Sequence, residues 1–158
     1  MIEQEELQTL IPHRGKMMLL NRVIEYDIEH SIRAEYTITR DCIFYDPALD
    51  GVPAWVGFEF MAQAISTLTG IRKRAKGEKP NIGFILSIPS MRMEIPFFKN
   101  GSSVEVSVTE TDRTDMIFTY KGEGFLKNKK VMEGKLMVME VNDEKYNELI
   151  KEQSGGHP

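Results

Sequence analysis

Hydrophobic and polar residues alternate along most of this chain, and one long apolar segment interrupts the alternation. Residues 31–39 (SIRAEYTIT) place every second side chain on one apolar face, which predicts a half-buried β-strand. Residues 103–111 repeat the pattern with three valines. Apolar or alternating segments predict further strands over 17–27, 81–95 (with a kink at Pro89), 116–126 and 130–141. The sequence LKNKKV predicts a hairpin turn between the last two strands.

The apolar segment, residues 54–75, predicts a helix that is buried on most of its sides. Pro53 stands before its first turn, where a missing N–H costs nothing. Gly77 follows the basic end of the segment and is expected to be the C-cap residue of this helix. Residues 40–53 contain Asp-Pro, Asp-Gly and Pro signals that are typical of a loop. Two shorter helices are expected over 3–10 and 143–152.

An antiparallel sheet with one apolar face must cover that face, and segment 54–75 is the predicted element large enough to do so. The pattern therefore predicts an α+β protein with the hot-dog arrangement, in which a sheet of five to six strands wraps around one long central helix. Residues 1–153 are expected to form this single domain, followed by a disordered tail over 154–158. A free sheet edge and the uncovered part of the helix predict a homodimer or a larger homo-oligomer.

Composition and charge exclude several classes of function. A length of 158 residues with 41% hydrophobic content fits one domain, and a net charge of -4 argues against a nucleic-acid binder. The single cysteine, Cys42, allows no internal disulfide and is expected to be a small buried residue. We find no membrane span and no signal peptide in MIEQEELQTL, so a cytoplasmic protein is expected. Because no metal-ligand cluster or phosphate-binding glycine loop occurs, no metal or nucleotide cofactor is expected.

The basic run Arg72-Lys73-Arg74-Ala75-Lys76 has two interpretations. One is a cationic last turn that complements the helix dipole. The other is a landing patch for an acidic partner or a phosphate. His30, in a predicted turn, is expected to be solvated.

One carboxylate, Glu59, lies inside the apolar stretch GVPAWVGFEFMAQAIS. Burying a carboxylate is costly unless it finds a partner or raises its pKa. One interpretation is a structural acid that is paired with an arginine such as Arg14 or Arg22, or that faces solvent at the helix start. The other is a general acid in an apolar pocket. The N–H groups of residues 54–57 begin the helix without intrahelical partners, and we expect them to hold a carbonyl oxygen.

Two motifs flank this region. The sequence LIPHRGKMMLLNRV at 10–23 resembles LPHRxPxLLxDRV, and PAWVGFEFMAQ at 53–63 resembles PGVLxxExxAQ. Both patterns belong to the small β-hydroxyacyl-acyl-carrier-protein dehydratases of the FabZ type. The chain resembles in particular the ApeP-type dehydratase-like proteins of aryl-polyene gene clusters, whose helix start also reads Pro-x-Trp-Val-Gly-x-Glu. The resemblance implies a hot-dog fold, a site built from two chains, and a 3-hydroxyacyl thioester substrate. Its phosphopantetheine arm belongs to an acyl carrier protein or coenzyme A, with no other cofactor.

The chain departs from that family at the catalytic base. The family reads GHFPGxPxxPG before the helix, and its histidine falls on Tyr45, a poor base because a phenol has a pKa near 10. Glu59 acting as base and acid in turn is one alternative, and Asp46, beside Tyr45, is a second alternative base. His13 is another, although a hydrogen-bonded loop histidine is its structural interpretation. The resemblance implies a site with Glu59, Tyr45 and His13 as catalytic residues, Ala54, Trp55, Gly57, Gln63 and Pro47 as substrate-binding residues, and no metal.

Three functions fit these observations. The first is dehydration of a 3-hydroxyacyl thioester in fatty-acid or polyene synthesis, with Glu59 as the acid. The second is a non-catalytic acyl-binding subunit, in a heterodimer with a complete hot-dog dehydratase that supplies the histidine. The third is an acyl thioesterase, in which the same carboxylate acts with water as the nucleophile.

Overall fold

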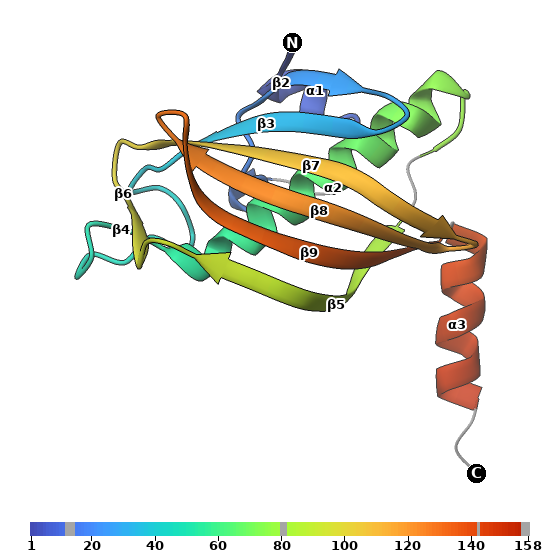
Figure 1. The fold of residues 1–158 in the computed structure, drawn as a ribbon. Coiled ribbons are helices and arrows are strands. Elements are labelled where there is room, and N and C mark those ends of the chain that lie inside the picture. Colours follow the sequence, from blue (N-terminus) through green and yellow to red (C-terminus); the bar gives the residue numbers. More distant parts are fainter. Residues whose placement is uncertain (12–14, 80–81, 142, 156–158) are drawn as a thin grey trace.

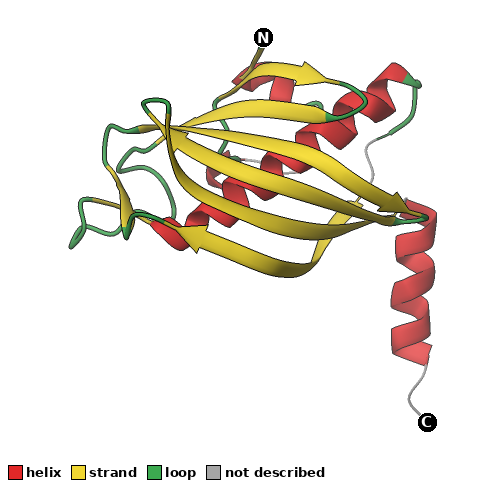
Figure 2. Ribbon diagram, in the orientation of Figure 1, coloured by secondary structure: helices red, strands yellow, loops and turns green. Residues whose placement is uncertain are grey.

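A curved antiparallel sheet wraps around one long helix. The computed structural model describes residues 1–11, 15–79, 82–141 and 143–155. The helix α2 (Gly57–Ala75) runs diagonally across one face of the sheet (Figure 1; Figure 2). Seven strands form the sheet in the order β1-β2-β3-β7-β8-β9-β5. This arrangement confirms the predicted hot-dog fold, with seven strands instead of five to six.

The strands follow the alternation closely where they are long. The sheet comprises β1 (Ile2–Glu3), β2 (Arg22–Asp27), β3 (Ser31–Thr37), β5 (Ile82–Met93), β7 (Ser103–Thr114), β8 (Ile117–Leu126) and β9 (Lys129–Val141). A separate ribbon pairs β4 (Gly51–Pro53) with β6 (Phe97–Lys99). The shorter helical segments are α1 (Gln4–Leu7), the 3-10 turns η1 (Gly15–Met17) and η2 (Ala54–Val56), and α3 (Asp143–Gly155).

Several predicted boundaries change: the helix expected over 3–10 is only α1, Gln4–Leu7, and three further changes lie near α2 or before β2. The strand expected from residue 17 begins at Arg22, because η1 occupies 15–17 and the next residues are buried without joining the ladder. The loop 40–53 ends in β4, which lies so close to β6 that a Cβ on Gly51 would be 2.2 Å from the Phe98 carbonyl oxygen. The helix expected from residue 54 starts as the tighter turn η2 before α2 begins.

Local signals for turns are confirmed where backbone conformation demands them. Lys127 and Asn128, between β8 and β9, have φ of 49° and 66°, as a two-residue hairpin turn requires. Gly77 follows α2 with φ of 69° and donates its N–H to the Arg74 carbonyl, which is the predicted C-cap. The pairing of β5 with β9 shifts register around Pro89, the expected kink.

The core lies between α2 and the sheet. Phe60 of α2 is fully buried and stacks on Tyr36 of β3, with ring centroids 4.2 Å apart. The three valines of β7 are fully buried beside it (Val104, Val106 and Val108). Each such side chain contributes about 1.5–3 kcal/mol relative to exposure. The apolar faces of the strands and of the helix thus pack against each other in one layer.

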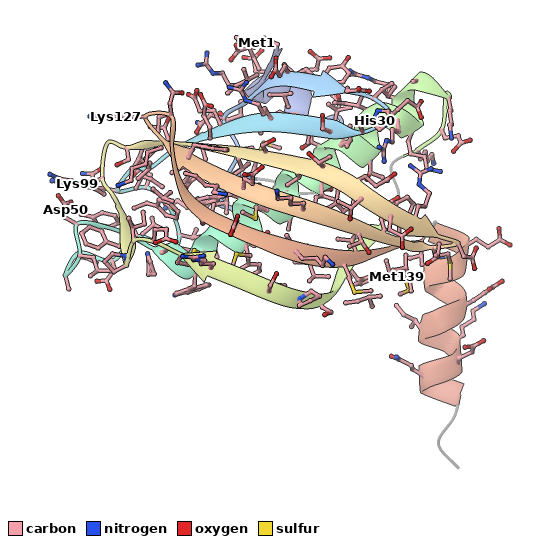
Figure 3. The ribbon with its side chains drawn as sticks, viewed as in Figure 1. Met1, His30, Asp50, Lys99, Lys127 and Met139 are labelled. Atoms are coloured by element: carbon pink, nitrogen blue, oxygen red, sulfur yellow. The ribbon has the colours of Figure 1, made fainter. Side chains whose placement is uncertain are left out.

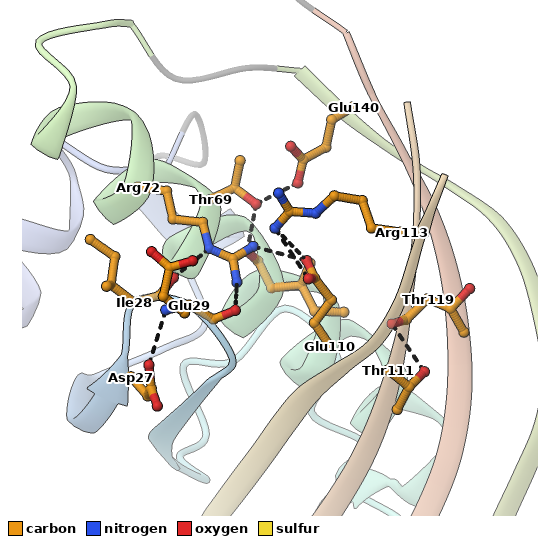
Figure 4. Close-up of polar contacts among 11 residues, drawn as sticks. Asp27, Ile28, Glu29, Thr69, Arg72, Glu110, Thr111, Arg113, Thr119 and Glu140 are labelled. Atoms are coloured by element: carbon orange, nitrogen blue, oxygen red, sulfur yellow. Dashed lines mark hydrogen bonds and ion pairs between the residues drawn. The ribbon is translucent and has the colours of Figure 1, made fainter. Parts of the chain in front are cut away.

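The basic end of α2 is bound by the chain's own acids (Figure 4). The Arg72 side chain donates to the Ile28 carbonyl oxygen (2.6 Å), the Glu29 carbonyl oxygen (2.9 Å) and the Glu110 carboxylate (3.1 Å). Lys73 pairs with Glu78, and Arg74 pairs with Glu6. These contacts favour the structural interpretation of the run, because Arg72, Lys73 and Arg74 already have acidic partners within the chain.

The remaining predictions concern the chain ends and isolated residues. Helix α3 extends to Gly155, two residues into the segment expected as a tail, and residues 156–158 lie outside the described part. His30 is exposed (Figure 3) and its Nδ1 lies 3.2 Å from Asp27, whereas Cys42 is half-buried against the core. In the described residues, no helix combines the length and apolarity needed to cross a membrane.

Candidate functional site

Glu59 lies in the first turn of α2, on the side of the helix that the sheet leaves open. Neighbouring positions at helical spacing share this side, and we call them the open strip: Trp55, Phe58, Glu59, Ala62 and Ser66. Trp55 is 55% exposed, and the other four are half-buried. Glu59 is therefore half-buried in the single chain, between the apolar pocket and the solvent-facing helix start that the sequence left open. Its carboxylate lies at the edge of the apolar layer.

Gln63 positions the carboxylate. Its side chain is fully buried, and its Oε1 accepts a hydrogen bond from the Leu19 N–H at 2.9 Å. Its Nε2 donates to the Met17 carbonyl oxygen at 2.7 Å and to Glu59 Oε1 at 3.4 Å. Because the Leu19 N–H only donates and the Met17 carbonyl only accepts, the amide orientation is determined. Gln63, expected to bind substrate, is thus held by the backbone at 17 and 19 with its amide directed at Glu59.

The amides that begin the helix are mostly occupied. The Ala54 N–H donates to the Pro96 carbonyl oxygen at 3.1 Å, which contradicts the expectation that it is free for a substrate. The Gly57 N–H donates to the Ala54 carbonyl oxygen and so closes the 3-10 turn. Val56 is the last residue of this turn and lies within the same i→i+3 hydrogen-bond pattern. Among the described residues, the Trp55 amide has no backbone acceptor outside this turn. Trp55 therefore carries the candidate oxyanion donor.

Tyr45 does not have the chemistry of a base. Its hydroxyl donates to Asp50 Oδ1 at 2.5 Å. This hydrogen bond, followed by burial, raises the pKa of the Tyr45 phenol, and the same bond lowers the pKa of Asp50. Asp50 lies at the end of the molecule where α2 begins (Figure 3). Asp46, the neighbouring residue considered as a base, accepts a hydrogen bond from the Ala48 N–H at 2.9 Å within its own loop.

Aromatic rings border the site. Trp55 meets Phe44 edge-on, with centroids 5.8 Å apart, and lies nearly parallel to Phe58 at 6.2 Å. Pro47 is exposed in the preceding loop, where its carbonyl accepts the Asp50 N–H at 3.3 Å. Sequence reasoning missed Phe44, because an aromatic residue in a loop has no periodicity that would mark it. The rings form an apolar wall beside the carboxylate.

Two other expectations have different outcomes. Arg22 forms an ion pair with Glu35 at 2.9 Å. The interpretation in which Arg22 pairs with Glu59 is therefore wrong. His13 and Arg14 lie outside the described residues. Within the described ranges, no three His, Cys, Asp or Glu side chains are grouped to hold a metal ion.

Comparison with known proteins gives one family and consistent relatives. The family model described as ApeP-like, ApeP dehydratase, matches residues 5–151. The 3-hydroxyacyl-[acyl-carrier-protein] dehydratase FabZ of Anaeromyxobacter dehalogenans is 25% identical over 142 residues, covering 88% of this chain and 90% of that protein. The FabZ of Escherichia coli is 26% identical over 140 residues, with coverage of 86% and 91%.

Solved structures agree on the fold. The dehydratase heterocomplex ApeI:P from Xenorhabdus doucetiae contains a chain with a TM-score of 0.84 and 24% identity, covering 91% of this chain and 96% of that chain. A mutant thioesterase from Pseudomonas aeruginosa has a TM-score of 0.64 at 10% identity, with coverage of 88% and 94%. At these identities, the likeness shows the shared hot-dog fold and not a shared reaction.

Proposed function

This chain belongs to the ApeP-like dehydratase family, and from that premise we propose that it acts on 3-hydroxyacyl thioesters carried by an acyl carrier protein. The observation that carries the proposal is the position of Glu59 on α2, held by Gln63 beside an apolar wall and the Trp55 amide. A carboxyl group near a carbonyl-binding amide has the components for proton transfer next to a thioester. We also propose that this reaction is a step of fatty-acid or polyene synthesis.

Dehydration removes one proton from the carbon α to the thioester and the hydroxyl from the β carbon, which leave together as water. The Trp55 N–H is placed to stabilise the negative charge that develops on the thioester oxygen when the α proton leaves. Glu59 in its protonated form donates to the departing hydroxyl. A base is still needed for the α proton, and Tyr45 donates its own proton to Asp50 instead.

A second candidate function follows because Tyr45 stands where the family has its histidine. The chain would serve as one subunit of a two-chain dehydratase, in which the partner supplies the histidine. One relative by fold is the ApeI:P dehydratase heterocomplex, which supports a heteromeric assembly of this kind. The half-buried open strip around Glu59 supports it further, because a second chain is needed to exclude water from the carboxylate.

The test is hydration of a crotonyl thioester, the reverse reaction, by the purified protein alone and with a dehydratase that contains the family histidine. Activity of the protein alone supports the enzyme. Activity that appears only in the mixture supports the subunit. Release of free thiol, without addition of water to the double bond, would instead identify a thioesterase and end the dehydratase proposal.

The edge of the sheet indicates where a partner chain joins. Strand β5 ends the sheet, so one of its edges has no strand partner within the described chain. Three successive apolar side chains there are exposed, Phe84 by 37%, Ile85 by 37% and Leu86 by 48%. A long apolar edge strand pairs readily with another strand. We expect a second hot-dog chain, identical or related, to pair along β5.

Replacing Ile85 by Lys is expected to convert the assembly into monomers, because a lysine in this edge must be desolvated on pairing. Light scattering after gel filtration measures the mass. The control is Tyr26→Lys, at an exposed position of β2, which should leave the mass unchanged. An Ile85→Lys protein with the wild-type oligomeric mass would show that the interface lies elsewhere.

A further inference from the structure

The outer face of the sheet carries two lysines that face each other across neighbouring strands. Lys121 of β8 and Lys135 of β9 are directly opposite in the strand register, and both are exposed. Their sequence neighbours Tyr120 and Leu136 are fully buried, so the lysines lie on the face turned away from α2 (Figure 1). Like charges directly opposite each other, with Cβ atoms about 4.5–5.5 Å apart, destabilise an antiparallel pair.

The acids nearest to this pair of lysines are bound by another lysine. Glu123 and Glu133 lie opposite each other in the next row of the same face. Lys130 binds both carboxylates, at 3.6 Å and 2.8 Å. Lys130 lowers the pKa of Glu133, to which the more distant charge of Lys121 contributes less. Within the described ranges, neither Lys121 nor Lys135 forms an ion pair of its own.

Hydroxyl groups flank the two ammonium groups. Thr109 of β7 is opposite Lys121 in the register, and Ser90 of β5 is opposite Lys135. A shallow depression of about 540 Å³ lies over this part of the sheet, and its lining includes Ser90, Thr111 and both lysines. A volume of this size holds a small organic molecule. Ammonium and hydroxyl groups are hydrogen-bond donors, so the depression suits a ligand with several acceptor oxygens.

The charge of the depression indicates the class of ligand. Its lining holds three cationic side chains and one carboxylate, that of Glu133. Arg92 is bound to Glu94 at 2.8 Å, so the excess positive charge belongs to the two lysines. A phosphate monoester carries about -1.5 to -2 charges and three strong acceptor oxygens, so one phosphate can bind both ammonium groups. A continuous anionic lipid surface fits less well, because it would meet the carboxylates of Glu123 and Glu133.

We propose that Lys121 and Lys135, with the Ser90 hydroxyl, bind the phosphate group of a small phosphoester on the outer face of the sheet. The bound phosphate offsets the repulsion between the two lysines and links β5, β8 and β9 through the residues that hold it. The site lies on the opposite face of the sheet from α2. Binding there needs neither Glu59 nor an acyl thioester, so the ligand is distinct from the substrate of the proposed function.

The test is thermal unfolding in sodium phosphate and in sodium chloride at equal ionic strength, which separates binding from screening. Phosphate at about twentyfold its Kd is expected to raise the unfolding temperature of the wild type by about 4–7 °C, because it binds the folded state. In chloride, Lys121→Gln should unfold about 1–3 °C above the wild type, because the repulsion is removed. The same variant should bind phosphate about tenfold more weakly, and Lys135→Gln should behave alike.

Two controls define the site. Lys99→Gln removes an exposed lysine of β6 at the end of the molecule (Figure 3), and it should respond to phosphate as the wild type does. Glu59→Gln should also keep the full response, since Glu59 lies on the other side of the sheet. A wild type that unfolds at the same temperature in phosphate and chloride, or a phosphate response that survives both lysine substitutions, overturns the proposal. Sedimentation with vesicles of phosphatidic acid and phosphatidylcholine, without a response to free phosphate, would assign the lysines to a membrane surface and overturn it as well.

Discussion

Glu59→Gln is expected to lower thioester hydration by about 10²- to 10⁴-fold, the usual contribution of a positioned general acid or base. The amide has the size of the carboxyl group but does not exchange a proton in this reaction. Gln63 still holds the side chain at this position, because its Nε2 donates to the carbonyl oxygen of the new amide as it does to Glu59 Oε1. The loss should therefore appear in kcat, with little change in unfolding temperature.

The control is Glu94→Gln, which removes an exposed carboxylate that pairs with Arg92. It should retain wild-type turnover. Both variants are assayed alone and together with a dehydratase that contains the family histidine, so that the result holds for either proposed role. If Glu59→Gln turns over as fast as the wild type in both assays, Glu59 has no part in proton transfer.

Arg72→Met is expected to reduce the free energy of unfolding by about 3–5 kcal/mol, because it removes one partner of a largely buried ion pair. The side chains of Arg72 and Glu110 are only 14% and 13% exposed. The substitution leaves the Glu110 carboxylate with less compensation and also removes the donors to the Ile28 and Glu29 carbonyl oxygens. Urea unfolding measures the change, with a shift in midpoint at a constant slope.

Arg113→Met is the matched control for this measurement, because Arg113 binds the same Glu110 carboxylate but is 49% exposed. A solvent-exposed pair contributes about 0–1 kcal/mol, so the control should lose far less stability. Equal losses in the two variants would mean that the burial of Arg72 is not the cause. The comparison also tests whether the end of α2 is anchored to the β2–β3 turn.

The long elements followed from the sequence because their signals are local. Alternation marked β3 and β7, and an unbroken apolar pattern marked α2. Strands of two or three residues, β1 and β4, are too short to show a period, so they were missed. Met17, the first residue of the strand expected over 17–27, ends a 3-10 turn instead, because apolar content alone does not determine the backbone.

The candidate site, too, was only partly predictable from the sequence. Glu59 was identifiable from sequence because a carboxylate inside an apolar helix is conspicuous, and the two motifs supported it. Whether the helix-start amides are free could not be predicted, because the Ala54 N–H donates to the carbonyl oxygen of Pro96, which is distant in the sequence. The histidine missing at Tyr45 was visible in the sequence, but its hydrogen bond to Asp50 was not.

By itself, the sequence determined the helix at the centre, the long strands around it, and the acid on that helix, because each depends on residues within a few positions of one another. Only the tertiary structure decided that the Ala54 N–H is bound by the Pro96 carbonyl oxygen and that Arg72 is buried by Glu110 and the β2–β3 turn. Hydrogen bonds, burial and ion pairs between distant segments depend on how sheet and helix pack, and no local pattern encodes that packing.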